Sequence, residues 1–269
     1  MIIDFHTHVF PDAIAKPTID FLSSKSGYTP YGDGTFESLV SLMDNGCIDK
    51  SVILPVVTKP SQFAKVNEFA KSLEAAGRVY SFGGIHPADE TPFEHLDRIK
   101  EMGLHGIKLH PDYQGAFIDD ERYISIIRYA LSIGLAVVTH AGVDDGCSGE
   151  VKCTPDRILR VLDAVYSGST PSEPRIILAH AGGFKMYDEV LKKLCGLPVY
   201  FDLAYVMEFA DPEIMLSIIH SHGADKMLFA SDSPWSDPGK SAEKLRQLPL
   251  SQEELDKIFF KNALRVLGK

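Results

Sequence analysis

The stretch "IIDFHTHVF", residues 2–10, places two histidines in an apolar run that has the character of a β-strand. In an extended strand, side chains two residues apart project to the same face, so His6 and His8 point to one spot. Packing alone seldom needs two imidazoles on one face of a strand, but a divalent metal ion accepts that arrangement. The stretch therefore predicts a metal site at the end of the first strand.

Further apolar runs follow, separated by segments with helical spacing, so strands and helices alternate along the chain. We predict strands over 2–8, 50–56, 79–86, 106–110, 135–140, 175–180, 199–205 and 226–232. We predict helices over 36–46, 62–76, 91–102, 120–133, 155–166, 184–195, 212–222 and 251–268. This alternation favours an α/β fold of the (β/α)₈ TIM-barrel type, and strands that are apolar throughout fit a parallel sheet buried on both faces. Strand count alone leaves a doubly wound open sheet as the alternative.

The domain organisation follows from the lack of a Pro- or Gly-rich linker in the sequence. We predict one domain over 1–269. The segment 9–35 is too long and irregular for a plain loop, and we expect it to form a flap over the first strand. The last helix opens with a capping-box pattern, in which Ser251 is followed three residues later by Glu254.

Composition and charge narrow the function classes. The formal net charge is -10, which leaves no basic footprint for nucleic acid or anionic lipid. No run approaches the roughly 18 apolar residues of a membrane span, and no secretion leader precedes Ile2, so we expect a cytoplasmic protein. The four cysteines are too scattered for a disulfide scaffold. Cys147 and Cys153 could close a small ring or bind metal, but incidental thiols also account for them.

Reactive residues gather at the carboxyl ends of the predicted strands. In a barrel these ends form the rim where enzymes build their sites. The residues at these ends are His6, His8, His86, Lys108, His110, His140, His180 and Asp232. The other four histidines (His95, His105, His220 and His222) fall on helices or in turns, and we assign them structural roles.

Several of these strand-end residues stand in sequence contexts that favour a site over packing. His140 and His180 are each followed by Ala-Gly, which leaves the imidazole unobstructed. Asp232 follows the run "MLFAS", where a carboxylate is costly unless it is paired or metal-bound. Lys108 should face the barrel mouth, where a buried lysine needs a partner or a purpose. His86 and His110 could equally line the rim or bond a loop.

The motifs "DFHTH", "GIKLHP", "VVTHAG", "ILAHAGG", "YFDLA" and "LFASDSPW", in that order, resemble the amidohydrolase superfamily of metal-dependent barrel enzymes. The nearest likeness is to its amidohydrolase-2 (aminocarboxymuconate-semialdehyde decarboxylase-like) branch, over essentially the whole chain. The resemblance implies that His6, His8, His140 and Asp232 bind one divalent metal, Zn²⁺ with Mn²⁺ as the alternative. It also implies that His180 is a catalytic base or electrophile beside the metal. Asp232, as a ligand through one oxygen, can in addition take a proton from the metal-activated water, so we expect it to be catalytic too. Three imidazoles and a carboxylate leave a coordination position open, as a catalytic zinc site requires.

Lys108 departs from the family pattern. Binuclear members of the superfamily carry a carboxylated lysine or a glutamate between two metals at about this place. A second metal held by carboxylated Lys108, His140 and His180 is therefore one reading. In the other, which we adopt, an unmodified Lys108 holds an anionic substrate as a point charge.

These features predict a metal-dependent hydrolase whose metal-activated water attacks a small, acidic carbonyl substrate such as a lactone or amide. Lys108, His110, His86 and Trp235 are the expected substrate-binding residues. The alternative is a nonoxidative decarboxylase or hydratase acting on a small carboxylated substrate, because the ligand set does not separate these reactions. Two further readings are phosphoester cleavage, as in TatD-like nucleases, and a barrel kept as a binding scaffold. The expected partner is a small molecule, and a homodimer is compatible with the sequence.

Specificity should lie in the loops 9–35, 111–118, 141–154 and 233–240. The loop after the fifth predicted strand is the most distinctive, because it carries Asp144, Asp145, Glu150 and Lys152. In the seventh strand, Asp202 is placed either to brace a ligand histidine or only to bond the backbone.

Overall fold

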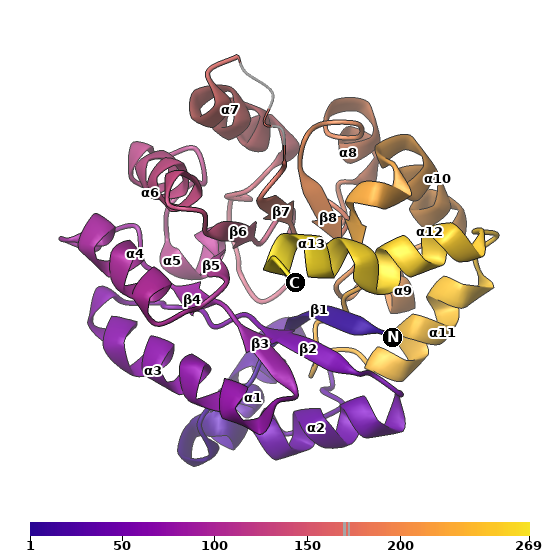
Figure 1. The fold of residues 1–269 in the computed structure, drawn as a ribbon, viewed down its shortest axis with the longest axis horizontal. Helices are drawn as coiled ribbons and strands as arrows, with labels where there is room; N and C mark the ends of the chain where they lie inside the picture. The colour runs from indigo at the N-terminus through magenta and orange to yellow at the C-terminus, as the bar shows by residue number, and fades with distance from the viewer. Residues whose placement is uncertain (169–170, 172) are drawn as a thin grey trace.

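A computed structural model describes residues 1–168, 171 and 173–269, and its strands form a parallel barrel surrounded by helices (Figure 1). The strands are β1 (Ile3–Thr7), β2 (Lys50–Ile53), β3 (Val79–Ser81), β4 (Gly83–Gly84), β5 (Gly106–Leu109), β6 (Ala136–Thr139), β7 (Ile176–Leu178), β8 (Tyr200–Asp202) and β9 (Met227–Leu228). Every predicted strand is present. Most end earlier than predicted, so the residues His8, His110, His140, His180 and Asp232 lie just past the strand ends.

The strands form two hydrogen-bonded groups, β1-β2-β3 and β4 to β9 in order, and all neighbours are parallel. β3 and β4 are two pieces of one barrel strand, interrupted at Phe82, whose N–H donates to the Ile53 carbonyl at 3.0 Å. The second junction between the two groups, where β9 meets β1, is closed by backbone hydrogen bonds. They run from Phe5 N–H to the Phe229 carbonyl (2.8 Å) and from Asp232 N–H to the His6 carbonyl (2.9 Å). The predicted (β/α)₈ barrel is confirmed, and the open sheet is excluded.

Helices occupy the predicted segments between the strands. They are α2 (Phe36–Asn45), α3 (Phe63–Leu73), α4 (Pro92–Glu101), α6 (Glu121–Ser132), α7 (Pro155–Tyr166), α8 (Tyr187–Lys193), α10 (Pro212–His222), α12 (Gln252–Asp256) and α13 (Asn262–Leu267). A π-helical turn over Lys257–Lys261 joins the last two. The Ser251–Glu254 capping box is formed at the start of α12, as predicted. In the part of the chain described, no helix has the length and hydropathy that crossing a membrane requires.

Four helices were not predicted from the sequence: α1 (Asp12–Ser26), α5 (Pro111–Gln114), α9 (Val206–Phe209) and α11 (Pro238–Gln247). The segment 9–35 is therefore not irregular, because α1 fills most of it despite Pro17 inside the helix. The loop 233–240 is also shorter than expected, since Asp237 caps α11 by accepting from the N–H groups of Gly239 and Lys240.

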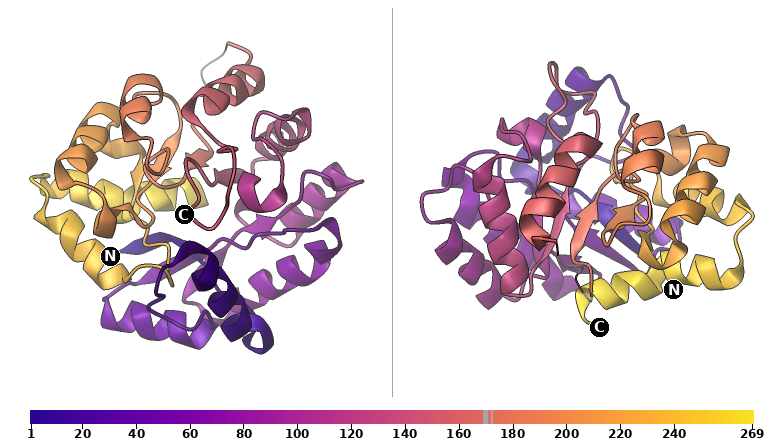
Figure 2. Two further views of the ribbon diagram at one scale, coloured as in Figure 1. Left: turned by 180° about the vertical axis from the view of Figure 1, so that it is seen from behind. Right: turned by 90° about the horizontal axis from the view of Figure 1, so that it is seen from above.

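The two ends of the barrel differ in what covers them. Views from opposite sides place α13 across one end and α1 at the other (Figures 1 and 2). Ala263, Val266 and Leu267 of α13 join the buried apolar cluster inside the barrel, which includes Phe5 of β1 and Val138 of β6. This apolar plug closes one end, so the open mouth lies at the other, where the predicted site residues stand.

A register shift in β1 points the histidines into that mouth. Ile3 and Asp4 pair with Lys50 and Ser51, but Thr7 pairs with Ile53, so β1 contains one extra residue. Such a bulge lets two consecutive side chains face the same way. Phe5 packs in the inner cluster, and His6, next to it, also points inward.

Candidate active site

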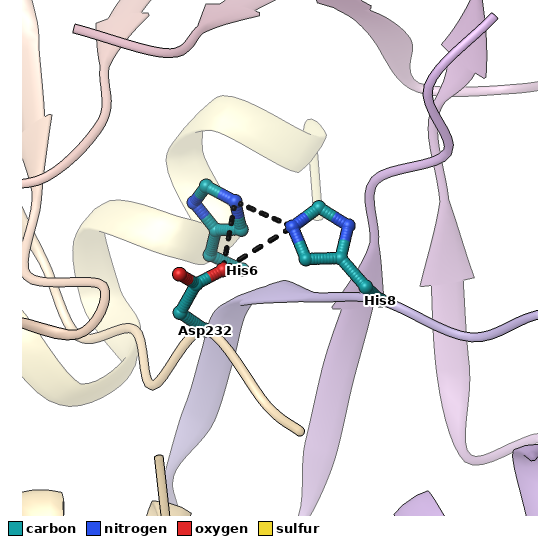
Figure 3. Close-up of side chains that lie close together, drawn as sticks. All are labelled: His6, His8 and Asp232. Carbon is teal, nitrogen blue, oxygen red and sulfur yellow. Dashed lines mark hydrogen bonds and ion pairs between the residues drawn. The ribbon is translucent and has the colours of Figure 1, made fainter. Parts of the chain in front are cut away.

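His6, His8 and Asp232 converge on one point at the barrel mouth (Figure 3). The Nε2 atoms of His6 and His8 are 3.1 Å apart. Oδ1 of Asp232 lies 3.5 Å from His6 Nε2 and 3.2 Å from His8 Nε2. The sequence predicted that His6 and His8 share one face. In the structure, both imidazoles on that face reach the carboxylate of Asp232, which follows β9.

Hydrogen bonds on the far side of each ring fix which nitrogen is free. His6 Nδ1 lies 2.8 Å from Asp202 Oδ2, and His8 Nδ1 lies 2.9 Å from the Leu54 carbonyl oxygen. Because both partners only accept, each Nδ1 carries the proton and each Nε2 presents a lone pair. The rings are held in the tautomer that ligates a metal through Nε2. Of the two roles weighed for Asp202, bracing His6 is the one its Oδ2 fills.

His140 presents a third lone pair by the same reasoning. His180 Nδ1 lies 3.0 Å from the Ala204 carbonyl, so it donates, and His180 Nε2 is left to accept from His140 Nδ1 at 3.0 Å. His140 Nε2 is then unprotonated, and it is buried without a hydrogen-bond partner among the described residues. A buried lone pair without a partner is costly unless a ligand takes it.

These observations fit a divalent metal. Two imidazole nitrogens and a carboxylate oxygen meet at one point, and the donor set suits Zn²⁺ or Mn²⁺. His140 as the fourth ligand remains a prediction, which its orphaned Nε2 supports. His140 belongs to a different cluster from the first three residues, and its ring lies against His180 and His110.

Backbone geometry at the strand ends explains how these side chains are presented. His180 and Asp232 have φ values of 58° and 72°, in the left-handed region that side-chain-bearing residues rarely adopt. Strain of this kind concentrates at functional sites. After His140, the main chain at Gly142 runs so close to Phe184 that a Cβ would overlap its backbone. The Ala-Gly step after His140 therefore lets its loop pack tightly against the loop after β7 and brings His140 beside His180.

Charge in the site is divided between ionised and neutral groups. Burial would raise the pKa of Asp232, but His6, His8 and His180 outweigh it and hold that pKa below its usual value. Burial, with Lys108 nearby, lowers the pKa of His6 well below its ordinary range. Lys108 is fully buried, and burial lowers its pKa to about 8 although Asp202 and Asp232 oppose the shift. Its Nζ lies 3.1 Å from His6 Nε2, so the Lys108 side chain faces the His6–His8–Asp232 cluster, as predicted.

A second group of candidate ligands comprises His110, His140 and Asp144. The imidazole rings of His110 and His140 are stacked, with centroids 4.4 Å apart and planes inclined by 15°. Lone pairs of imidazole lie in the ring plane, so two nearly parallel rings cannot aim them at one ion. His110 Nε2 instead lies 3.4 Å from Asp144 Oδ2, and burial lowers the pKa of His110 well below its usual value, so the two residues form a polar contact on the cavity wall rather than a second metal centre.

The site opens into a cavity of about 660 Å³. The predicted substrate-binding residues Lys108, His110 and Trp235 line it, as do His140, His180, Asp144 and Asp145. His86 does not line it, and its Nδ1 instead accepts from the Ala88 N–H in a turn. Of the other loop residues singled out, Glu150 pairs with Arg157, and Lys152 lies over the Phe117 ring. Cys147 and Cys153 are free thiols.

Sequence reasoning missed much of the cavity wall. Side chains from α1 and α3 also line the cavity, among them Ile14 and Leu22 of α1 and Val66 and Phe69 of α3. Their helical spacing was the available signal, and in α1 Pro17 obscured it. Buried Asp4 was missed as well. It accepts from Ser231 N–H at 2.8 Å, and burial raises its pKa to about 7.

Comparison with known proteins places the chain in a family. The amidohydrolase family model matches residues 3–269, so the chain belongs to the amidohydrolase family. No curated protein matches the sequence.

Solved structures with the same fold include decarboxylases and a hydrolase. A 2,6-dihydroxybenzoate decarboxylase from Rhizobium has a TM-score of 0.71 at 14% identity, covering 99% of this chain and 98% of that one. A Pseudomonas putida protein assigned as a 2-pyrone-4,6-dicarboxylic acid hydrolase has a TM-score of 0.67 at 17% identity, covering 99% and 97%. A dihydroxybenzoic acid decarboxylase from Polaromonas sp. JS666, with bound manganese, has a TM-score of 0.70 at 16% identity, covering 99% and 96%. These likenesses establish the fold, and the family is that of metal-dependent enzymes.

Proposed function

We propose that the protein is a metal-dependent hydrolase of a small carbonyl compound that carries an acidic group. One observation carries the proposal. Asp232, a carboxylate kept ionised at neutral pH, stands within 3.5 Å of the Nε2 atoms of two imidazoles whose ring protons are held on Nδ1. An ionised carboxylate at a metal site is equipped to accept a proton from water, which hydrolysis needs first.

The residues that would hold the metal are His6, His8 and Asp232, with His140 as the fourth. When bound, the cation supplies Lewis acidity and makes water easier to deprotonate. Asp232 accepts the proton and later returns it to the leaving group. His180 lines the cavity beside these ligands and polarises the carbonyl oxygen of the bound substrate; in the free protein its Nε2 accepts from His140 Nδ1. Lys108 attracts the acidic group of the substrate.

Nonoxidative decarboxylation is the second candidate, and Asp144 is the observation that favours it. Burial raises the pKa of this cavity-lining carboxyl, although Gly146 N–H and His180 oppose the shift. A raised pKa makes Asp144 easier to protonate than an ordinary aspartate, which suits it to deliver a proton to the substrate carbon as the bond from that carbon to the carboxylate carbon breaks and CO₂ leaves. A largely apolar cavity would also favour losing the charged carboxylate.

One experiment separates the two reactions. Enzyme loaded with Zn²⁺ or Mn²⁺ is assayed on lactones, amides and aromatic acids, with product hydrolysis and CO₂ release measured separately. We expect Asp232→Asn to lower kcat/KM for hydrolysis by at least about 100-fold, the usual contribution of a positioned proton acceptor. Asp144→Asn should leave hydrolysis within a few-fold, as should Glu150→Gln, the control from the same loop.

Near-wild-type hydrolysis in a folded Asp232→Asn variant would refute the hydrolase proposal. CO₂ release that is lost in Asp144→Asn and retained in Glu150→Gln would establish decarboxylation instead. Circular dichroism and metal content of each variant confirm that a lost activity does not reflect a lost fold.

A further inference from the structure

The cavity extends well beyond the metal ligands, into a space between α1 and α3. We call this part the apolar arm. It is lined by Phe10, Ile14 and Leu22 on the α1 side and by Pro55, Val66 and Phe69 on the α3 side. α1 lies at the open end of the barrel, opposite α13 (Figure 2). The arm is continuous with the site, because the same cavity is lined by His6, His8 and Asp232.

Apolar side chains of α1 are left uncovered at this cavity. Ile14 is 50% exposed and Phe21 is 59% exposed, and both line the cavity. Large apolar side chains on a concave surface mark a place where apolar ligand area is buried. The same helix buries Ala15 and Ile19 against the rest of the protein, so α1 has one apolar face for the fold and another for the cavity.

Charge is distributed unevenly along the cavity. Lys108, Asp144, Asp145 and Asp232 belong to the barrel mouth and the loop beside it. On the arm, the charged lining residue is Lys65, which lies on the exposed side of α3. A charged ligand segment buried in the arm would find no buried opposite charge to pair with, whereas an uncharged segment needs none.

The size of the cavity supports the same reading. A single carboxylated ring has about ten heavy atoms, whereas cavities of roughly 300–1,000 Å³ enclose ligands of drug size. At about 660 Å³, this cavity has room for the reacting carbonyl at the ligand cluster and for a substituent several atoms long.

We infer that the substrate is elongated, with its reacting carbonyl at the metal ligands and an uncharged alkyl or aryl tail in the apolar arm. The inference rests on the proposed function, since that function places the carbonyl end. It adds a specificity determinant: contacts of Leu22, Val66 and Phe69 with the tail select substrates by tail length.

The test uses linear alkanoates as probes, from acetate to octanoate, titrated into the Zn²⁺-loaded protein by calorimetry. The carboxylate takes the place of the reacting carbonyl at the cluster, and the chain enters the arm. Each added methylene should tighten binding about fourfold until the arm is filled, as burial of a CH₂ predicts. Binding that does not change from butanoate to octanoate would overturn the inference.

Variants locate the effect. Val66→Trp fills the arm and should abolish the dependence on chain length while acetate binds as before. Ala64→Trp adds the same bulk on the exposed side of α3, outside the cavity lining, and should keep the dependence. Leu22→Glu places a charge in the arm from the α1 side and should weaken octanoate binding by at least tenfold, whereas exposed Ser24→Glu should not. Chain-length dependence that survives both arm variants would refute the arm as the binding place.

The two levels of the proposal fail differently. If the protein shows Zn²⁺-dependent hydrolysis but binds all alkanoates equally, the arm assignment is wrong and the hydrolase stands. If alkanoate binding depends on chain length and on Val66, but the Zn²⁺-loaded protein hydrolyses none of the lactones or amides, the tail site stands and the hydrolase is wrong. The same holds if Asp232→Asn hydrolyses them as fast as the wild type does.

Discussion

Asp202 shows how one buried residue can set the chemistry of two others. Its Oδ2 holds His6 Nδ1 at 2.8 Å, while its Oδ1 accepts from the N–H groups of His180 (3.0 Å) and Ala204 (3.1 Å). Burial raises the pKa of Asp202, although His180 and Lys108 oppose the shift. Because its two oxygens have different partners, the carboxylate fixes both the tautomer of His6 and the position of the backbone at His180.

These separate hydrogen bonds of Oδ1 and Oδ2 predict the effect of Asp202→Asn. The amide oxygen can still accept from the two backbone N–H groups, but the amide NH₂ would face His6 Nδ1. That nitrogen must then accept, which moves the ring proton to Nε2 and removes the lone pair that ligates. We expect affinity for Zn²⁺ to fall about 10–100-fold with the fold retained. Competition with a chromogenic chelator measures the affinity.

The matched control for that measurement is Asp225→Asn, in the turn after α10 and away from the site. It should bind Zn²⁺ as the wild type does. Equal affinity in Asp202→Asn and Asp225→Asn would show that the orientation of His6 does not depend on Asp202.

At the scale of the elements, sequence reasoning succeeded where the signal is local. The apolar runs of the strands and the histidines at their ends are neighbours in the chain, so the barrel and the mouth could be predicted without knowing any long-range contact. The pairing of His140 with His180, by contrast, depends on the close approach of the chain at Gly142 to Phe184. No short-range pattern encodes that approach.

Two elements show why the rest could not be predicted. Pro17 lacks the N–H that a helix interior uses, and this feature favours an irregular reading of a segment that forms α1. The extra residue in β1 changes which side chains face inward, because a strand alternates faces with a period of two. Both depend on what the segment packs against, so the cavity wall between α1 and α3 emerges only in the folded chain.

His222 at the end of α10 supports a prediction about stability and pH. Its ring stacks on Phe201 of β8 at 3.7 Å, its Nε2 donates to the Val199 carbonyl (2.9 Å), and its Nδ1 accepts from Gly196 N–H (3.2 Å). The folded site therefore holds a neutral ring, and burial lowers the pKa of His222 to about 4. The structural role assigned to His222 from the sequence agrees with these contacts.

The sign of the effect follows from comparing the two states. Unfolded His222 takes up a proton near pH 6.5, whereas the folded ring stays neutral down to about pH 4. The free energy of unfolding should therefore fall as pH drops from about 6.5 towards 4, by about 3 kcal/mol from this group. In His222→Gln, urea unfolding between pH 7 and 5 in the presence of a chelator should depend less steeply on pH. Exposed His220→Gln, on the same helix, should keep the wild-type slope, and identical slopes in both variants would contradict the assignment.

Over the whole molecule, the candidate metal ligands lie at the seam where the barrel closes. His6 lies in the first strand, His8 directly follows it, and Asp232 follows the last strand, so the cluster joins the first and last strands of the barrel. Backbone bonds already link this seam, from Asp232 N–H to the His6 carbonyl and from His8 N–H to the Ser233 carbonyl (2.7 Å). A cation held here would tie the three-stranded group to the six-stranded group.

Removing the metal should therefore destabilise the barrel at that seam first. At a metal concentration about 100 times the dissociation constant, binding stabilises the folded state by about 2.7 kcal/mol, so chelation should lower the Tm by about 5–10 °C. Hydrogen exchange should increase most in β1 (Ile3–Thr7) and in the segment around Asp232, while β6 (Ala136–Thr139) stays protected. If chelation left the Tm and β1 exchange unchanged in protein shown to have bound Zn²⁺, the ion would not be held across the seam. A metal that stabilised the wild type but not Asp232→Asn would instead place the ion at this junction, because the carboxylate is the ligand contributed from the end of the last strand.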